Sequence, residues 1–252
     1  MPEGDTIHRI ARSMNAALAG REVEHASAPN PRSPVFNRAS ELDGRTLERA
    51  EARGKHLLVH FSGGLVVHSH LGMNGRWRID VDGVPPRGRP WLALRSGTAT
   101  ASQSGGQILR LVSESRARND PGIAQLGPDP LVPGFDVHEA AARLRRLGAG
   151  REVGDAILDQ TIIAGIGNAI RTEALFIARV SPWRPVDDLD EETAERVLQE
   201  SQRVMRITLE SGRRPRTLRD GRGRCPRCGG RVLSRGQGDA SRIAYWCERC
   251  QV

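Results

Sequence analysis

The chain has 252 residues, 38% of them hydrophobic, and 38 Lys and Arg stand against 30 Asp and Glu, which gives a net charge of +8. This composition excludes disordered and collagen-like proteins, because the hydrophobic fraction is sufficient for a core. It also excludes a membrane-embedded protein, because no apolar run approaches the roughly 20 residues that a membrane helix needs.

The first predicted element is an amphipathic helix over residues 6–18. Ile7, Ile10 and Met14 repeat at helical spacing behind Asp5 or Thr6 as the candidate N-cap. The residues before the helix contain neither a basic region nor an apolar run, so we expect no secretory signal. A cytoplasmic protein with reduced cysteines is the expectation that follows.

A β-rich region is predicted between residues 22 and 113, where short apolar or alternating runs are separated by turns rich in Gly, Pro and Asp. This pattern is typical of an antiparallel β-sandwich or barrel. Ser102–Gln107 is expected to be a flexible hairpin tip, and 113–122 a polar loop. The strands are expected at 46–53, 56–61, 65–70, 76–81, 91–96 and 108–112.

A proline-rich segment at 126–133 predicts a linker, after which the pattern becomes helical. Gly165 and Gly167 predict a tight turn, and Asn168 is the candidate N-cap of the helix that follows. The free N–H groups of such a turn suit a phosphate, although a purely structural helix start has the same sequence. The helices are expected at 136–147, 152–159, 168–178 and 190–211.

All four cysteines fall in one arrangement. Cys225-x2-Cys228 is followed after 18 residues by Cys247-x2-Cys250, which is the spacing of a four-thiolate zinc site. A pair of disulfides would need an oxidising compartment, and a redox Cys-x-x-Cys motif would not need a second copy. We therefore expect one structural Zn²⁺, because four protein ligands leave no position open for water.

The segment between the cysteine pairs fits a β-hairpin that carries Arg231, Arg235 and Arg242. From Gly212 to Val252, eleven arginines stand against three acidic residues, which accounts for the whole net charge. A basic module on a neutral body is typical of an appendage that binds a polyanion, although a solvated basic tail has the same composition. We interpret it as a zinc ribbon or zinc β-hairpin finger that contacts nucleic acid.

Two further groups have distinctive chemistry. Removal of Met1 would leave Pro2 as a secondary amine, which forms a permanently cationic iminium with an aldehyde carbon, and Glu3 could donate a proton beside it. Lys55, the only lysine, lies between two strand runs and so on a hairpin turn. A solvated turn lysine is the ordinary alternative, but unlike an arginine it can release a proton.

Four motifs together resemble the formamidopyrimidine-DNA glycosylase and endonuclease VIII family in order and spacing. They are Met1-Pro-Glu-Gly-Asp5, Arg53-Gly-Lys55, Gly165-Ile-Gly-Asn168 with Glu173-Ala-Leu-Phe176, and Cys225 to Gln251. The resemblance covers nearly the whole chain and implies an α+β, multidomain protein with DNA bound between its domains. The expected parts are an N-terminal helix and β-sandwich (1–125), a linker (126–133), a helix-two-turn-helix domain (134–212) and a zinc β-hairpin finger (213–252).

The resemblance also implies catalytic roles. Pro2 would attack C1′ of the damaged nucleoside, Glu3 would protonate the sugar, and Lys55 would contact the DNA backbone and assist elimination. Arg242 would take part in δ-elimination. The start of the chain and His70–Arg78 look more like the endonuclease VIII branch, which favours oxidised pyrimidines.

DNA-binding roles are implied for Asn168 and Arg242, which would hold phosphates near the flipped nucleotide. Met73 looks like a wedge that fills the gap left by the extruded base, with ordinary core packing as the alternative. The sequence departs from the family in two places. Thr6 replaces an acid that many members carry, and in 113–120 the Arg of the remaining wedge pair is ambiguous and its aromatic is missing.

The leading hypothesis is a bifunctional DNA glycosylase and abasic-site lyase of base excision repair, acting by β- and δ-elimination. The alternative is a catalytically inactive protein that binds lesions or abasic sites with the same scaffold, and a weaker one is an RNA-binding zinc-ribbon protein. The expected partner is damaged duplex DNA, and we expect a monomer that is cytoplasmic and nucleoid-associated when bound to DNA.

Overall fold

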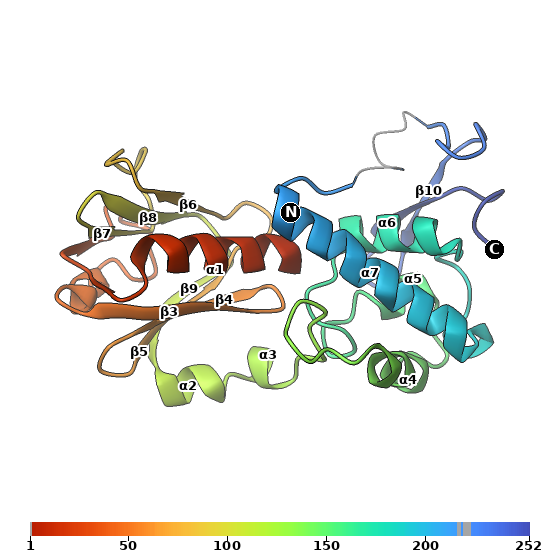
Figure 1. Cartoon of the computed structure of the whole chain (residues 1–252), viewed down its shortest axis with the longest axis horizontal. Helices are drawn as coiled ribbons and strands as arrows, with labels where there is room; N and C mark the ends of the chain where they lie inside the picture. Colours follow the sequence, from red (N-terminus) through yellow and green to blue (C-terminus); the bar gives the residue numbers. More distant parts are fainter. Residues whose placement is uncertain (1, 216–217, 219–222) are drawn as a thin grey trace. The chain divides into compact units, whose positions relative to one another are not determined.

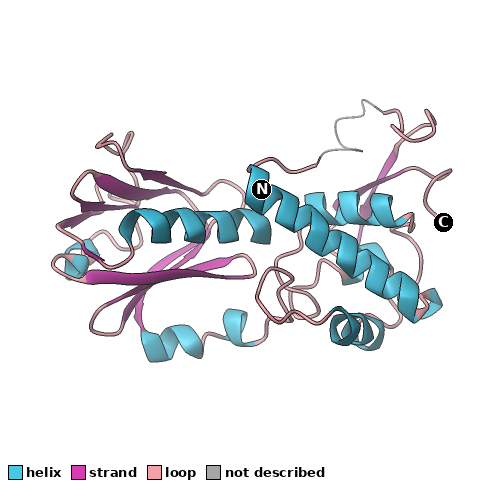
Figure 2. Ribbon diagram, viewed as in Figure 1, coloured by secondary structure: helices cyan, strands magenta, loops and turns pink. Residues whose placement is uncertain are grey.

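The structure is a computed structural model that describes residues 2–215, 218 and 223–252. The chain divides after Gln125 into two compact units. The strands of the first unit and the helices of the second are distinguished in Figure 2. Met1 of the N-terminal motif, and residues 216–217 and 219–222 of the expected finger, lie outside the described residues.

The first unit is a β-sandwich, as the alternating pattern predicts. One sheet has five strands in the order β1-β3-β4-β5-β9, the other has four in the order β2-β7-β8-β6, and all their pairs are antiparallel. The strands are β1 (Arg21–Glu22), β2 (His25–Ser27), β3 (Thr46–Arg53), β4 (His56–Phe61), β5 (Leu65–His70), β6 (Arg76–Asp80), β7 (Leu92–Ser96), β8 (Ala99–Ser104) and β9 (Ile108–Ser113), with a short helix η1 (Ala39–Leu42).

Helix α1 (Gly4–Leu18) packs against both sheets, beside β3 and β4 on one side and β6 and β8 on the other (Figure 1). Its apolar face, including Ile7 and Met14, is part of the sandwich core. The expected cap was wrong. Glu3 is the N-cap, because its carbonyl accepts the N–H groups of Thr6 at 2.9 Å and Ile7 at 3.1 Å, so the helix begins at Gly4.

Two expected loops have regular structure. Ser102–Ser104 belongs to strand β8, and only Gly105–Gln107 form the hairpin tip. The expected polar loop contains α2 (Glu114–Arg118) and α3 (Pro121–Ala124), capped by the side chains of Ser113 and Asp120. Ala117 of α2 packs on the outer face of the five-stranded sheet, which explains why this polar segment folds there.

The second unit contains the predicted helices α4 (Val137–Leu147), α6 (Asn168–Ala178) and α7 (Glu191–Ser211), and the short α5 (Val153–Ala156) and η2 (Val186–Asp188). Helix α7 packs against both α4 and α6. The helix expected at 152–159 is shorter, because the carboxylate of Asp159 accepts the N–H of Thr161 at 3.0 Å and forms a turn instead.

The predicted finger hairpin is confirmed as β10 (Leu233–Gln237) paired with β11 (Arg242–Trp246). These strands carry Arg235 and Arg242 as expected, but Arg231 lies before β10, in an isolated bridge with Arg224. It packs within the same unit as the helices, since Phe176 of α6 forms a buried cluster with Leu218, Cys225 and Cys247. Gln237, which is buried, donates to Glu152 and to the carbonyl of Pro182, both at 2.8 Å. The turn end of the hairpin, where Gln237 pairs with Arg242, is therefore fixed to the helical part of the unit.

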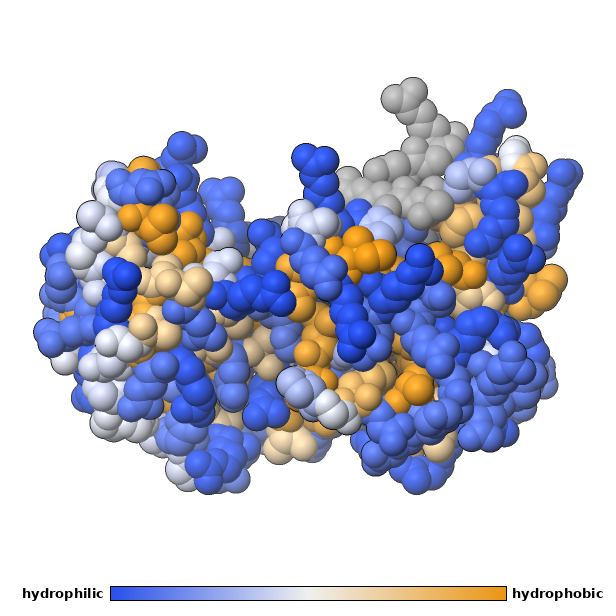
Figure 3. All heavy atoms as spheres, viewed as in Figure 1, coloured by the Kyte–Doolittle hydropathy of each residue, from blue (hydrophilic) through white to orange (hydrophobic). Residues whose placement is uncertain are grey.

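Across the residues that the structure describes, the helices are too short or too polar for any of them to cross a membrane. The face of the molecule drawn in Figure 3 is largely hydrophilic, with hydrophobic atoms in smaller patches.

Candidate functional site

Pro2 and Glu3 lie immediately before the first turn of α1. Pro2 is half-buried, and Glu3 has an exposed fraction of 1%. Asp5 is also buried, and its carboxylate accepts the N–H of Thr6 at 2.6 Å and the Thr6 hydroxyl at 3.1 Å. Thr6, which stands where the resemblance implies an acid, thus hydrogen-bonds to Asp5. The structure thus buries two acidic side chains directly after Pro2, Glu3 at the N-cap and Asp5 in the first turn of α1.

Lys55 lies in the two-residue turn between β3 and β4, as the sequence predicts. Gly54 supplies the turn with a φ of +56°, which a residue with a side chain adopts at a cost. His56 and His70 are direct partners in the β4–β5 ladder, and their ring centroids are 4.8 Å apart. Burial and then the charge of Lys55 lower the pKa of His70. Lys55 therefore sits beside a histidine pair at one end of the five-stranded sheet.

Met73 occupies the loop between β5 and β6 and has an exposed fraction of 78%, so the core-packing alternative is wrong. The loop is closely supported. A Cβ on Gly75 would lie 2.5 Å from the carbonyl oxygen of Leu71 and 2.7 Å from Cα of Gly106. The β8–β9 tip, Gly105–Gln107, therefore lies directly against the Met73 loop.

The sequence leaves the remaining wedge residues of the resemblance unidentified in 113–120, because Arg116 and Arg118 compete for one role and no aromatic is present. Both are exposed on α2, which packs on β5 and β9. The residue that the structure brings beside the Met73 loop is Gln107, whose backbone N–H donates to the carbonyl of His70 at 2.8 Å. Two consecutive glycines before Gln107 were the only sequence signal for this close approach.

In the second unit, Asn168 is the first residue of α6, and its expected role as N-cap was wrong because Gly167 holds that position. The Asn168 side-chain amide donates to the carbonyl of Ile243 in β11 at 3.0 Å, and its oxygen accepts from Arg171. Arg242, next to Ile243, is exposed at the start of β11. The structure therefore brings Asn168 and the backbone of Arg242 together.

Arg171 is a residue that the sequence interpretation missed. Its exposed fraction is 1%, and it donates to the side chain of Gln237 at 3.0 Å and to the carbonyl of Ile243 at 2.9 Å. The signal was an arginine on a mostly apolar helix, three residues after Asn168. Arg171 fixes both Asn168 and the finger hairpin.

The four cysteines form one cluster whose sulfur atoms all lie within 4.8 Å of one another. Sγ of Cys225 is 3.8 Å from that of Cys250, and Sγ of Cys228 is 3.5 Å from that of Cys247. A tetrahedral zinc with Zn–S bonds of about 2.3 Å has S–S edges of about 3.8 Å, whereas a disulfide is about 2.05 Å long. The cluster can hold one metal ion with four thiolates.

A chain of polar contacts crosses the outer face of the five-stranded sheet. Nδ1 of His56 is 2.9 Å from Nε2 of His68, and Nδ1 of His68 accepts from Arg110 at 3.1 Å. Arg110 in turn pairs with Asp120, whose other carboxylate oxygen accepts the N–H of Gly122 at 3.0 Å. The chain runs from the cap of α3 to the residue that follows Lys55.

This network leads us to expect acid sensitivity. Burial, reinforced by neighbouring positive charge, lowers the pKa of His56 to about 3 and that of His68 to about 4, from 6.5. Below pH 6.5 these two histidines therefore bind protons in the unfolded chain that they do not bind in the folded chain, and their contribution to stability falls as the pH falls. For each histidine, the free energy of unfolding changes by up to about 1.4 kcal/mol per pH unit. Urea unfolding at pH 7.5 and pH 5 measures it.

The matched variants for this measurement are His56→Phe and His25→Phe, the second at an exposed position of β2. His56→Phe is expected to flatten the acid slope, and His25→Phe to leave it as in the wild type. Equal slopes in all three proteins would show that His56 is not held neutral by the fold.

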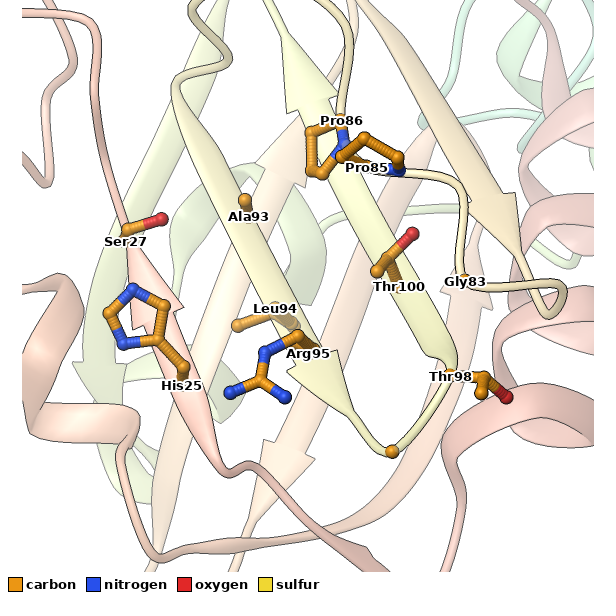
Figure 4. A pocket seen from close by; sticks show the side chains of 11 residues that line it. His25, Ser27, Gly83, Pro85, Pro86, Ala93, Leu94, Arg95, Thr98 and Thr100 are labelled. Atoms are coloured by element: carbon orange, nitrogen blue, oxygen red, sulfur yellow. The ribbon is translucent and has the colours of Figure 1, made fainter.

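Two other features lie outside this arrangement. A cavity of about 170 Å³ on the four-stranded sheet is lined by His25, Arg95 and Thr100 beneath Pro85 and Pro86 (Figure 4). It is smaller than ordinary ligand pockets and contains none of the predicted site residues. His138, Glu191 and Glu195 also bring ligand atoms together, and the ion pair of His138 with Glu195 at 2.5 Å accounts for their proximity.

Comparisons with known proteins agree across the chain. Residues 1–112 match the formamidopyrimidine-DNA glycosylase N-terminal domain and residues 126–219 match the formamidopyrimidine-DNA glycosylase H2TH domain. The chain is 37% identical over 270 residues to "Probable endonuclease 8 2" of Streptomyces coelicolor, covering 100% of this chain and 94% of that protein.

It is also 32% identical over 263 residues to the DNA-(apurinic or apyrimidinic site) lyase Nei2 of Mycolicibacterium smegmatis, covering 100% and 99% of the two chains. The fold matches that of Lactococcus lactis Fpg, solved in complex with DNA containing an abasic site. The TM-score is 0.83 at 21% identity, over 99% of each chain.

Proposed function

Because this chain belongs to the formamidopyrimidine-DNA glycosylase and endonuclease VIII family and is a DNA glycosylase and abasic-site lyase of base excision repair, we propose that Pro2 is its nucleophile and oxidised pyrimidines its substrates. The observation that supports the nucleophile is the position of Pro2 at the start of α1, directly before the buried Glu3. The substrate class is the one that the resemblance to the endonuclease VIII branch implies, and the relatives named endonuclease 8 support that branch, with damaged DNA as the partner.

In the proposed reaction the unprotonated nitrogen of Pro2 attacks C1′ of the damaged nucleotide. The sugar ring opens as Glu3 protonates its oxygen, the base leaves, and C1′ becomes an iminium on Pro2. The iminium makes the 2′ proton acidic, and its loss expels the 3′ phosphate by β-elimination. Loss of a further proton expels the 5′ phosphate by δ-elimination, which we assign to Lys55 and Arg242. Hydrolysis of the iminium then releases Pro2.

The binding roles are proposed on the same basis. Met73, exposed on a tightly supported loop, fills the gap left by the extruded base. Lys55 and Arg242 contact backbone phosphates. Asn168 donates one amide hydrogen to Ile243 and has a second amide hydrogen for a phosphate oxygen.

We propose that the metal of the cysteine cluster is one structural Zn²⁺, held by Cys225, Cys228, Cys247 and Cys250, since four thiolates at these separations suit it. Its chemistry is to fix the hairpin rather than to react. We further propose a monomer, located in the cytoplasm and on the nucleoid when bound to DNA, in which residues 134–212 and 213–252 act as helix-two-turn-helix domain and finger.

A catalytically inactive lesion-binding protein is the second candidate, and the observation that favours it is Thr6 at a position where many members carry an acid. The bond from Thr6 to the buried Asp5 supports the enzyme instead, because a carboxylate remains in the same turn.

The experiment that tests the proposal is borohydride trapping. Tag-free protein, with its mature N-terminus established by mass spectrometry, is mixed with duplex DNA that contains one abasic site or one oxidised pyrimidine. We expect a covalent adduct that maps to Pro2 and nicked products with both lesions. A folded, metal-loaded protein that binds the DNA but gives neither adduct nor nick would favour the inactive binding protein.

A further inference from the structure

The polar chain on the outer face of the five-stranded sheet has a defined direction. Arg110 donates to Nδ1 of His68 from Nε at 3.1 Å and lies 3.0 Å from it through Nη2. A guanidinium has only donors, so Nδ1 of His68 accepts, and neutral His68 carries its proton on Nε2. That proton is donated to Nδ1 of His56 at 2.9 Å. His56 must therefore carry its own proton on Nε2.

The position of His56 indicates where its Nε2 proton can be donated. The two nitrogens of an imidazole point in nearly opposite directions, so the Nε2–H of His56 points away from His68, which lies nearer the middle of the sheet opposite Leu58. His56 directly follows Lys55 in the turn, and it is half-buried. A neutral N–H donor is thus carried by the residue that follows Lys55 in the chain.

The orientation of Arg110 is fixed by Asp120, at the other end of this chain of contacts. Asp120 pairs with Arg110 and also caps α3, and it is partly buried. The guanidinium is therefore held between a carboxylate and an imidazole, and its orientation sets the tautomer of both histidines.

We propose that His56 is a phosphate-binding residue that donates Nε2–H to the DNA backbone beside Lys55, and that Arg110 positions it by fixing its tautomer through His68. The inference rests on the proposed function, since it takes DNA as the ligand. A neutral donor suits this place, because it adds a directed hydrogen bond to the charge of Lys55 without repelling it.

The first test measures affinity for a duplex containing tetrahydrofuran, an abasic-site analogue that the lyase reaction does not cleave. His56→Phe keeps a ring of similar size and is expected to weaken binding roughly tenfold to a hundredfold, the loss of one hydrogen bond to a charged group. Because His56 is neutral, the slope of log K against log salt is expected to stay as in the wild type. Lys55→Gln is expected to reduce that slope by about 0.9. His25→Phe is the matched control.

The second test reads the tautomer directly. With ¹⁵N-labelled histidine, His56 of the wild type is expected to show a protonated Nε2 and a bare Nδ1. Arg110→Met is expected to give a mixture of the two tautomers and to weaken DNA binding by less than His56→Phe does, because only the fraction with a proton on Nε2 donates. The double variant is expected to bind no more weakly than His56→Phe alone.

The outcomes separate this inference from the proposed function. Wild-type affinity in His56→Phe, or a proton on Nδ1 of His56 in the wild type, would overturn the role of His56. A wild type that neither binds nor nicks lesion DNA would overturn the proposed function instead. A reduced salt slope in His56→Phe would show that His56 acts as a cation, which contradicts the tautomer argument.

Discussion

Protein that retains an N-terminal extension ahead of Pro2 is expected to lose glycosylase and lyase activity by at least about a thousandfold, the scale on which removal of a nucleophile acts. In an extended chain the Pro2 nitrogen is an amide, whose electron pair is delocalised into the carbonyl, so it cannot attack C1′. Single-turnover cleavage of duplex DNA with one oxidised pyrimidine measures the loss. The matched control is the same protein after the extension has been removed to expose Pro2.

Pro2→Gly makes a finer distinction. A glycine amine can still form an imine, but the imine loses its positive charge when its N–H is deprotonated, whereas the proline iminium has no such proton. We expect weaker glycosylase and lyase activities with an unchanged fold, because residue 2 lies outside α1, which begins at Gly4. Full activity in the extended protein would assign the nucleophile to another residue.

Loss of the metal is expected to have the second large effect. Cys225 has an exposed fraction of 2% and packs with Phe176, Leu218 and Cys247. Cys225→Ala removes one of four ligands, and because metal binding and folding are coupled in small metal modules, the β10–β11 hairpin is expected to unfold. DNA affinity is expected to fall at least about tenfold, since the hairpin presents the exposed Arg242.

Metal content by mass spectrometry and affinity for damaged duplex DNA check this prediction together. Ser234→Ala, at an exposed position of β10, is the matched control, and a chelator should reproduce the effect in the wild type. If Cys225→Ala binds damaged duplex DNA as the wild type does, the finger does not have the assigned role.

The elements predicted well are those whose hydrophobic pattern matches their burial. Strands β3, β4 and β5 and helix α6 have the predicted bounds. Strand β8 was missed because its residues are small and polar, although Gln103 in it is fully buried. Helix α2 was missed because only Ala117 faces the sheet, which is too little for a helical period. In both cases tertiary packing decided the structure.

Which features of the candidate site could be predicted depends on how far apart the residues lie in the sequence. Arrangements of residues that are close in sequence, such as Pro2 before Glu3 or the two cysteine pairs, were visible in the sequence. Contacts between residues far apart were not. Asn168 bonds to Ile243 across 75 residues, and Arg110 bonds to His68 across 42, and no local pattern encodes either pairing.

The buried guanidinium of Arg171 joins helix α6 to the β10–β11 hairpin. It donates to the carbonyl of Gly154 as well as to Gln237 and Ile243, so three separate segments share one charged group. Separating any one of these segments from Arg171 leaves a buried charge with a missing hydrogen bond. The free energy this costs is larger than that of a local fluctuation. In amide hydrogen exchange, α6, β10 and β11 should therefore behave as a single cooperative opening unit, with one shared protection free energy rather than three.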